Sequence, residues 1–251
     1  MLPAIRKIRN WPSFMYHYAL GLNPRRAYRF RNGAQLLIGR GIDHVPIIEI
    51  FLRKDYGVVP DGAVVLDLGA NIGAFTIYAT ATARGVRVYA YEPLPGFCKM
   101  LQENVRLNGQ NESVHIFNCA VAAAEGEREL GWGGDAFFFP TLLPSASGEN
   151  RENILVRTTT LAQILESNHL VRVDFLKMDC EGAEYEILYG TPSSILRRIS
   201  QIRMEYHNLD TGERNAHRLE QFLARNGYAV TRIRSTSESN GTLWAQREEA
   251  T

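Results

Sequence analysis

The segment "VVLDLGANIGAFTIYA", residues 64 to 79, has the pattern of a buried strand, a tight turn and a helix that begins near Gly73. Backbone N–H groups at a helix start favour an electron-rich ligand, and glycines let that ligand touch the backbone. A dinucleotide-binding loop would be Gly-x-Gly-x-x-Gly, but Asn71 and Ala74 replace two of its three glycines. No Gly-Lys-Ser/Thr follows, which excludes a P-loop. The loop therefore predicts a ligand site without identifying the ligand.

Strand and helix patterns alternate from residue 63 onward, which predicts an α/β fold with a mostly parallel sheet covered on both faces. Helical patterns include residues 95–109 and 159–168. The polar linker 234–241 is too short for a crossover helix, so the last two strands should pair antiparallel. The expected strands are residues 63–69, 86–92, 113–120, 173–179, 200–207, 228–233 and 242–247.

The first 42 residues hold eight Lys or Arg residues and no acid. A hairpin is expected at 27–41 around Asn32-Gly33, and a helix at 43–56 with Asp43 as its N-cap. We expect residues 1–58 to form a basic extension that packs on a domain at 59–251. A membrane surface or an anionic substrate are alternative partners for this extension.

The composition is that of a globular protein, with 45% hydrophobic and 22% charged residues among 251. The sequence has no apolar run of about 20 residues and no signal-peptide pattern, which argues against a transmembrane segment. Three cysteines without CxxC spacing predict a reduced, cytoplasmic protein. Beyond residue 42 the chain carries 20 basic against 27 acidic residues, so nucleic acid is not expected as a partner.

Residues 131–152 interrupt the alternation with a Gly/Pro/Ser-rich insertion that contains Trp132 and Phe137 to Phe139. A lid or substrate wall is one interpretation. An aromatic plug over a sheet edge is the other.

Glu92 ends the second core strand, in "VYAYEP", and Pro93 terminates that strand. An acid at this point of a doubly wound sheet accepts both ribose hydroxyls of a nucleoside. A nucleoside with a positive centre and no phosphate suits the loop, which points to S-adenosylmethionine.

Five blocks of this sequence resemble the FkbM-type S-adenosylmethionine-dependent methyltransferases. They are "VVLDLGANIGAFT", "YEPLPGFCKMLQENVRLN", "FNCAV", "FLKMDCEGAEYEILYG" and "MEYH", in family order across residues 63–207. The resemblance implies a doubly wound, Rossmann-like sheet of seven strands with an antiparallel C-terminal hairpin. It also implies a set of cofactor-binding residues: Asp67, Gly69, Ala70, Asn71, Gly73, Glu92, Pro93, Asn118, Ala120 and Asp179.

The strand at 173–179 ends in several carboxylates, in "FLKMDCEGAEYEIL". A carboxylate that leaves water needs a partner, and Asp179 would pair with the ammonium and sulfonium of the cofactor. Glu181 is expected to contact the acceptor. Glu184 is expected to have only a structural role, because the helix dipole stabilises an acid in the first helical turn. Glu186 is expected on a solvated face of the same helix.

Glu205 and His207 share one face of the next strand. We expect His207 to be the base that removes the acceptor's proton, with Asp179 and Glu205 beside it. A second mechanism would have Asp179, Glu181, Glu205 and His207 bind Mg²⁺ or Mn²⁺.

The predicted function is O-methylation of a hydroxyl on a sugar or secondary metabolite, in natural-product or glycan biosynthesis. Trp132 and Phe138, with Glu181 and His207, are the expected contacts to this acceptor. An N-methyltransferase, a nicotinamide-dependent oxidoreductase and a non-catalytic scaffold are the alternatives, and a homo-oligomer is possible.

Overall fold

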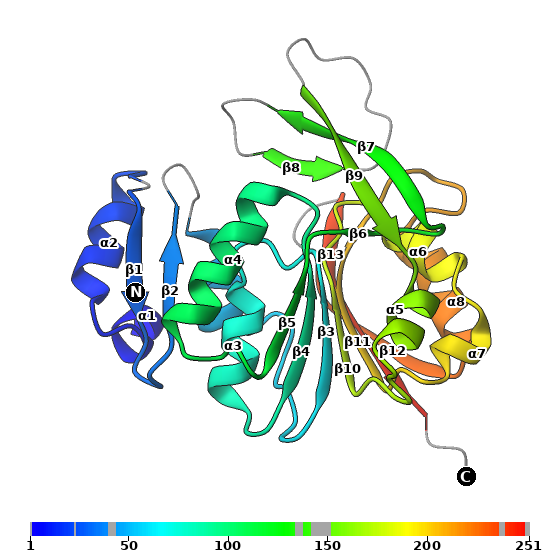
Figure 1. Ribbon diagram of the computed structural model, residues 1–251, viewed down its shortest axis with the longest axis horizontal. Helices are drawn as coiled ribbons and strands as arrows, with labels where there is room; N and C mark the ends of the chain where they lie inside the picture. The colour runs from blue at the N-terminus through cyan, green and yellow to red at the C-terminus, as the bar shows by residue number, and fades with distance from the viewer. Residues whose placement is uncertain are drawn as a thin grey trace. The chain divides into compact units, whose positions relative to one another are not determined.

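The computed structural model describes residues 2–22, 24–39, 44–133, 138–141, 152–235 and 239–248, without the side chains of 132–133, 138–141, 152 and 232–234. Seven strands form the main sheet, in the order β12-β13-β11-β10-β3-β4-β5 (Figure 1). They are β3 (Val64–Leu68), β4 (Arg87–Tyr91), β5 (Val114–Phe117), β10 (Phe175–Met178), β11 (Gln201–His207), β12 (Tyr228–Ser235) and β13 (Asn240–Arg247). All seven match strands expected from the sequence.

Pairing directions follow the predicted topology. Strand β10 pairs in parallel with both β3 and β11, so Leu176 faces Leu66 on one side and Ile202 on the other. Strand β13 runs antiparallel to β11 and to β12, which confirms the C-terminal hairpin. Every residue of β3 and of β10 is buried, as expected for central strands of a parallel sheet.

The chain divides into two compact units, residues 1–63 with 70–118, and residues 64–69 with 119–251. The boundary that the sequence suggests near residue 58 stays a prediction. The first unit contains β4, β5, the N-terminal hairpin and the helices up to residue 107. The hairpin and helices are α1 (Leu2–Lys7), α2 (Trp11–Ala19), β1 (Arg26–Arg29), β2 (Gln35–Ile38), η1 (Ile47–Arg53), α3 (Ala74–Thr82) and α4 (Pro95–Leu107).

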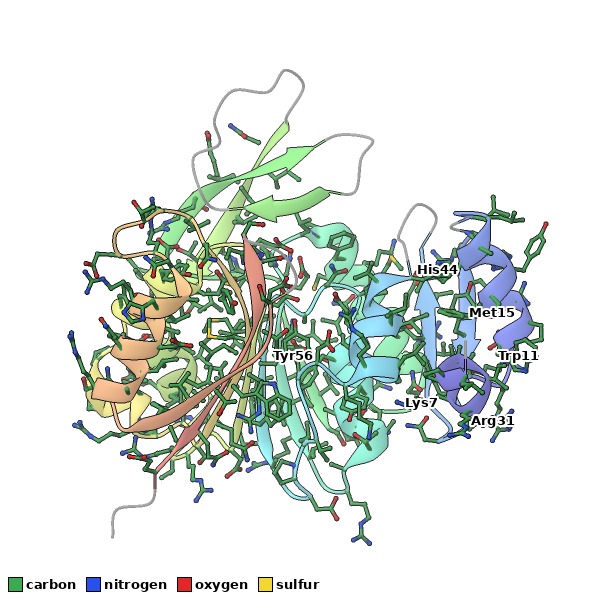
Figure 2. The ribbon with its side chains drawn as sticks, turned by 180° about the vertical axis from the view of Figure 1, so that it is seen from behind. Lys7, Trp11, Met15, Arg31, His44 and Tyr56 are labelled. Carbon is green, nitrogen blue, oxygen red and sulfur yellow. The ribbon has the colours of Figure 1, made fainter. Side chains whose placement is uncertain are left out.

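The N-terminal hairpin forms as predicted, with Tyr28 opposite Leu36. The helix after it differs from the prediction, because η1 is a π-helix capped by Pro46, and Asp43 lies outside the described residues. The ammonium of Lys7, labelled in Figure 2, donates to the carbonyls of Phe51 and Leu52 at 2.8 Å each and so ties α1 to the end of η1.

The buried side chain of Asn104 on α4 joins the hairpin to the glycine loop. Its amide donates to the carbonyls of Leu37 and Ile72, at 2.9 and 2.8 Å, and its oxygen accepts from the Leu37 N–H at 2.6 Å. One side chain therefore satisfies three backbone groups that would otherwise be buried without partners.

The second unit adds a four-stranded sheet, in the order β6-β9-β7-β8, that the sequence did not predict. Its strands are β6 (Ala120–Val121), β7 (Gly126–Gly133), β8 (Phe138–Thr141) and β9 (Glu152–Thr159). The strand expected at 113–120 is shorter than predicted, because β5 stops at Phe117 and Ala120 begins β6, which pairs with β9. Most of the 131–152 insertion lies outside the described residues, between β7 and β9.

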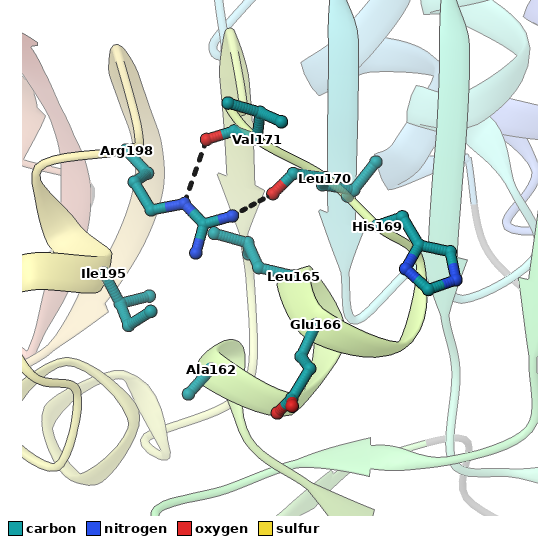
Figure 3. A pocket seen from close by; sticks show the side chains of 8 residues that line it. All are labelled: Ala162, Leu165, Glu166, His169, Leu170, Val171, Ile195 and Arg198. Atoms are coloured by element: carbon teal, nitrogen blue, oxygen red, sulfur yellow. Dashed lines mark hydrogen bonds between the residues drawn. The ribbon is translucent and has the colours of Figure 1, made fainter.

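Four helices complete the second unit: α5 (Leu161–Ser167), α6 (Glu184–Tyr189), α7 (Ser193–Leu196) and α8 (Ala216–Arg225). Figure 1 shows them together on one side of β10 to β13. A cavity of about 550 Å³ lies beside α5 and is lined in part by Leu165, Val171 and Ile195 (Figure 3). Arg198 also lines it and donates to the carbonyls of Leu170 and Val171. No helix of the described part of the chain is long and apolar enough to span a membrane.

Candidate functional site

The glycine loop follows β3 and requires two of its glycines for steric reasons. Gly69 has a φ of +69°, and a Cβ there would lie 1.8 Å from the carbonyl oxygen of Asp179. Gly73 has a φ of +87°, which strains any other residue, and a Cβ there would lie 2.4 Å from the side-chain Cδ1 of Leu101, which can move. Asn71 also takes a left-handed conformation, with a φ of 51°, and its side-chain oxygen accepts from the Ile72 N–H at 2.7 Å. The loop is therefore tightly packed, and α3 begins directly after it.

Glu92 is 3% exposed and lies in the first unit, at the end of β4. One carboxylate oxygen accepts from the Asn71 N–H at 2.8 Å and the other from the Leu94 N–H at 2.9 Å. These two bonds hold the carboxylate in one orientation and explain how a charged side chain is tolerated in a buried position.

Asn118 reinforces the same turn. Its side-chain amide donates to the carbonyls of Glu92 and Pro93, at 2.8 Å each. The N–H groups of this amide are therefore bonded to the protein backbone. Ala70, in the loop, is buried, and its N–H donates to the carbonyl of Tyr91 at 3.0 Å. The first unit thus brings Ala70, Asn71, Glu92, Pro93 and Asn118 into one hydrogen-bonded group. Ala120 is buried in the second unit, on β6.

A buried lysine organises the carboxylates of the second unit. The ammonium of Lys177, on β10, lies 3.3 Å from Asp67 and 3.7 Å from Asp179, and it donates to the Gly69 carbonyl at 2.8 Å. Burial alone would lower the pKa of Lys177, but the charges of Asp67 and Asp179 outweigh it and hold the pKa above its usual value. The sequence analysis paired Asp179 with the positive charges of the cofactor. It did not foresee that the ammonium of Lys177 lies beside this carboxylate. Two carboxylates against one ammonium still leave a net negative charge.

The acidic turn after β10 has an unusual backbone. Glu181 has a φ of 51° and Gly182 a φ of 99°, so two consecutive residues are left-handed. A non-glycine residue in this region is uncommon and tends to mark functional positions. Glu184, which begins α6, is fully buried and accepts from the Cys180 N–H at 3.0 Å, which closes the turn.

His207 lies at the end of β11 between two carboxylates. Its Nε2 is 3.4 Å from Glu181, its Nδ1 is 3.4 Å from Glu184, and Tyr185 donates to its backbone carbonyl at 2.7 Å. Its side chain is 18% exposed and that of Glu181 is 21% exposed, so solutes can reach this pair. A carboxylate therefore faces each ring nitrogen of the histidine that was predicted as the base, and the two carboxylates orient the ring.

The two carboxylates control the protonation of His207. Burial would lower its pKa, but Glu184 and then Glu181 raise it to about 9. The pKa of Glu181 is also raised, first by burial and then by the charge of Asp179, although His207 opposes this. The two groups interact strongly, so the imidazole keeps its proton at neutral pH and its base form appears only under alkaline conditions.

Glu205 has a different hydrogen-bond partner from Glu181 and His207. It accepts from the side-chain amide of Asn240 at 2.9 Å. In the part of the chain that the structure describes, no three His, Cys, Asp or Glu side chains have an arrangement that could hold a metal ion. The alternative in which Asp179, Glu181, Glu205 and His207 bind Mg²⁺ or Mn²⁺ therefore has no support.

Two residues of this site were missed by the sequence analysis. Lys177 could have been found, because a lysine inside an apolar strand needs a buried partner. Glu184 was explained by the helix dipole, yet it faces His207. Glu186, expected on a solvated helix face, is 32% exposed, and Arg128 on β7 also donates to both of its oxygens at 2.8 and 2.9 Å.

The aromatic side chains expected to contact the acceptor lie outside the described residues. The backbones of Trp132 and Phe138 belong to β7 and β8, but their side chains are not described, and Phe137 is not described at all. None of the residues that line the cavity beside α5 is a predicted site residue.

Comparisons with known proteins agree on one family. Residues 67–230 match the family model described as the methyltransferase FkbM domain. The 31-O-demethyl-FK506 methyltransferase FkbM of Streptomyces tacrolimicus is 28% identical over 220 residues, which cover 72% of this chain and 82% of that protein. The AMB antimetabolite synthetase AmbE of Pseudomonas aeruginosa is 30% identical over 234 residues, which cover 77% of this chain but only 11% of the synthetase.

A solved structure supports the fold. The methyltransferase FkbM of Methylobacillus flagellatus superposes with a TM-score of 0.52 at 16% identity, over 78% of this chain and 46% of that one. The seven-stranded sheet is that of the Rossmann-like class I methyltransferases.

Proposed function

Because the chain belongs to the FkbM methyltransferase family, we propose that it moves a methyl group from S-adenosylmethionine to a hydroxyl of a sugar or secondary metabolite. A hydroxyl is favoured over an amine as the acceptor because the site contains a candidate base. This base is the imidazole of His207, which lies 3.4 Å from Glu181 and from Glu184. An alcohol must lose its proton as it attacks the methyl carbon, whereas a neutral amine needs little help from a base. The name of the Streptomyces relative, which refers to an O-demethyl compound, is consistent with this choice.

Glu92 is the proposed partner of the cofactor's ribose. Its carboxylate is fixed by the N–H groups of Asn71 and Leu94, and a carboxylate has about four acceptor positions. Ribose hydroxyls can therefore donate to it without displacing these bonds.

The residues around Lys177 suit a cationic ligand. Asp67 and Asp179 outweigh the single ammonium, and the cofactor supplies a methyl group on a positively charged sulfur together with an ammonium. We assign the methionine part of the cofactor to Asp67, Gly69, Ala70, Asn71 and Gly73, as the family resemblance implies, with Asp179 beside it.

Glu184 would accept the Nδ1 proton of His207 and leave Nε2 to take the proton of the acceptor. The ring-to-carboxylate distances of 3.4 Å are long for hydrogen bonds, but such contacts often tighten when a substrate binds. The competent base is the neutral imidazole, which carries its proton on Nδ1 and none on Nε2. Most of the remaining rate enhancement would come from aligning the methyl carbon and the acceptor oxygen, about 3 to 3.5 Å apart.

Methyl transfer from labelled S-adenosylmethionine to a panel of hydroxylated and amine acceptors tests this function. We expect an O-methylated product, and we expect His207→Gln to lower turnover by roughly 10²- to 10⁴-fold with unchanged cofactor affinity. His217→Gln, at an exposed position on α8, is the matched control. Methylation of amines alone, or a His207→Gln variant with full turnover, would contradict the proposal and favour N-methylation.

Contact of the acceptor with Trp132 and Phe138, a cytoplasmic location and assembly into a homo-oligomer stay predictions.

A further inference from the structure

Helix α2 is unusual for a surface helix because its sequence, "WPSFMYHYA", contains no Asp, Glu, Lys or Arg. One side packs inward, where Phe14 is 2% exposed and contacts the ring of Tyr28 at 5.5 Å. Tyr16 on α2 and Leu20, the residue that caps its C-terminus, are 59% and 57% exposed. A surface helix normally turns charged or polar residues to water, so this second apolar face is unexplained by the fold of the first unit.

Arginines precede and follow this helix in the chain, and two of them lie next to one another. Ile8 and Phe30 form an antiparallel bridge, and the Arg9 N–H donates to the Arg29 carbonyl at 2.7 Å, so Arg9 and Arg29 stand opposite one another. Like charges placed directly opposite on neighbouring strands are destabilising. An anion that lies against both would remove this repulsion.

The arginines around α2 lack acidic partners. Arg25 pairs with Glu103, but within the described ranges we find no ion pair for five other exposed arginines. These five are Arg6, Arg9, Arg26, Arg29 and Arg31.

The side chain of Asn10 holds the start of α2 against β1, the strand that contains Arg26 and Arg29. The side-chain oxygen of Asn10 accepts from the Arg29 N–H at 2.9 Å, and its amide donates to the Ala27 carbonyl at 3.1 Å. Arg31, labelled in Figure 2 together with Trp11 and Met15 of α2, donates from its guanidinium to the carbonyl of Ile5 on α1 at 3.4 and 3.3 Å. The apolar face and the cationic residues therefore belong to one part of the first unit.

We propose that this N-terminal surface, defined by Tyr16 and Leu20 with Arg6, Arg9, Arg26, Arg29 and Arg31, docks on an anionic lipid bilayer. Tyrosine and leucine enter the boundary between headgroups and acyl chains, and arginines bind the lipid phosphates. A second copy that presents the same surface is a poor occupant, because residues 1–42 have no acid and two such surfaces would repel each other. A bilayer supplies both the negative charge and the apolar layer that the surface lacks.

Flotation of the full chain with phosphatidylcholine vesicles, with and without phosphatidylglycerol, tests the docking. We expect binding only when phosphatidylglycerol is present, and release at high salt. Each basic residue near an anionic surface strengthens binding by about fivefold, so Arg9→Gln/Arg29→Gln should weaken it by roughly 25-fold. Tyr16→Ser/Leu20→Ser should also weaken it, because it removes the apolar contact.

Matched substitutions elsewhere separate docking from general effects of charge and hydrophobicity. Arg87→Gln/Arg106→Gln removes two other exposed arginines, and Leu155→Ser/Val171→Ser removes two apolar side chains that are 62% and 84% exposed. These controls should bind as the wild type does. Absence of binding to the anionic vesicles overturns the proposal, as does equal binding to neutral vesicles or equal weakening by the control variants. Circular dichroism of each variant confirms that it is folded.

Discussion

Replacing Gly69 by alanine tests whether the close approach of the glycine loop to Asp179 matters. The added Cβ would lie 1.8 Å from the Asp179 carbonyl oxygen, so the two backbones must separate by about 1.6 Å to reach the 3.4 Å of ordinary contact. The Asp179 N–H also donates to the Leu68 carbonyl at 3.1 Å, and this bond resists the separation. An added methyl group in a packed site costs about 1–3 kcal/mol. The left-handed φ of +69° adds roughly 1–2 kcal/mol.

Gly62→Ala is the matched control for this substitution. Gly62 has a φ of +74° but nothing within 4 Å of its added Cβ, so it should show the backbone strain alone. Urea unfolding should place Gly69→Ala about 1–3 kcal/mol below Gly62→Ala. Calorimetric titration with S-adenosylmethionine should show weaker binding only for Gly69→Ala, since displacements near 1 Å disturb an active site strongly. Equal stability and equal affinity in the two variants would refute the steric argument.

Three further predictions concern the buried polar groups. Lys177→Met leaves Asp67 and Asp179 without their shared cation, and it should lower the free energy of unfolding by about 3–5 kcal/mol in a urea titration. Because the carboxylates raise the pKa of His207 to about 9, its base form appears as the pH rises, so turnover at saturating substrate should increase up to that pH and then level off. Asn104→Leu removes three hydrogen bonds from buried backbone groups, and it should lower the melting temperature through a loss of about 1–3 kcal/mol for each group left unpaired.

Controls for these predictions come from exposed positions of the same residue types. Lys99→Met and Asn111→Leu should leave the stability unchanged, and equal losses in these variants would show that the buried contacts contribute nothing special. A turnover that is flat between neutral pH and pH 9 would contradict the assignment of the base to His207.

The main sheet could be predicted because its central strands are continuous apolar runs. Residues 64–68 and 175–178 are buried throughout, and the linker at 234–241 could accommodate only a hairpin. The second sheet was missed, although β6 and most of β7 and β9 lie outside the Gly/Pro/Ser-rich insertion. The segment at 152–159 does alternate, with Val156 buried and Leu155 exposed, so a period-2 signal was present.

The positions of candidate site residues could be predicted where they end a strand. Glu92 directly follows β4, and His207 ends β11, close to where the sequence placed them. The partners of these residues could not be predicted, because they depend on which elements pack together. Lys177 within β10 and Glu184 at the start of α6 each had a local explanation, and only the tertiary structure shows the carboxylates and the imidazole that they face.

Calorimetric titration with S-adenosylmethionine and with its demethylated product tests the central claim most directly. We predict that the wild type binds both, that folded Glu92→Ala binds neither, and that Glu112→Ala, at an exposed position, binds both as the wild type does. Failure of the folded wild type to bind either compound, or full affinity in Glu92→Ala, would contradict the account.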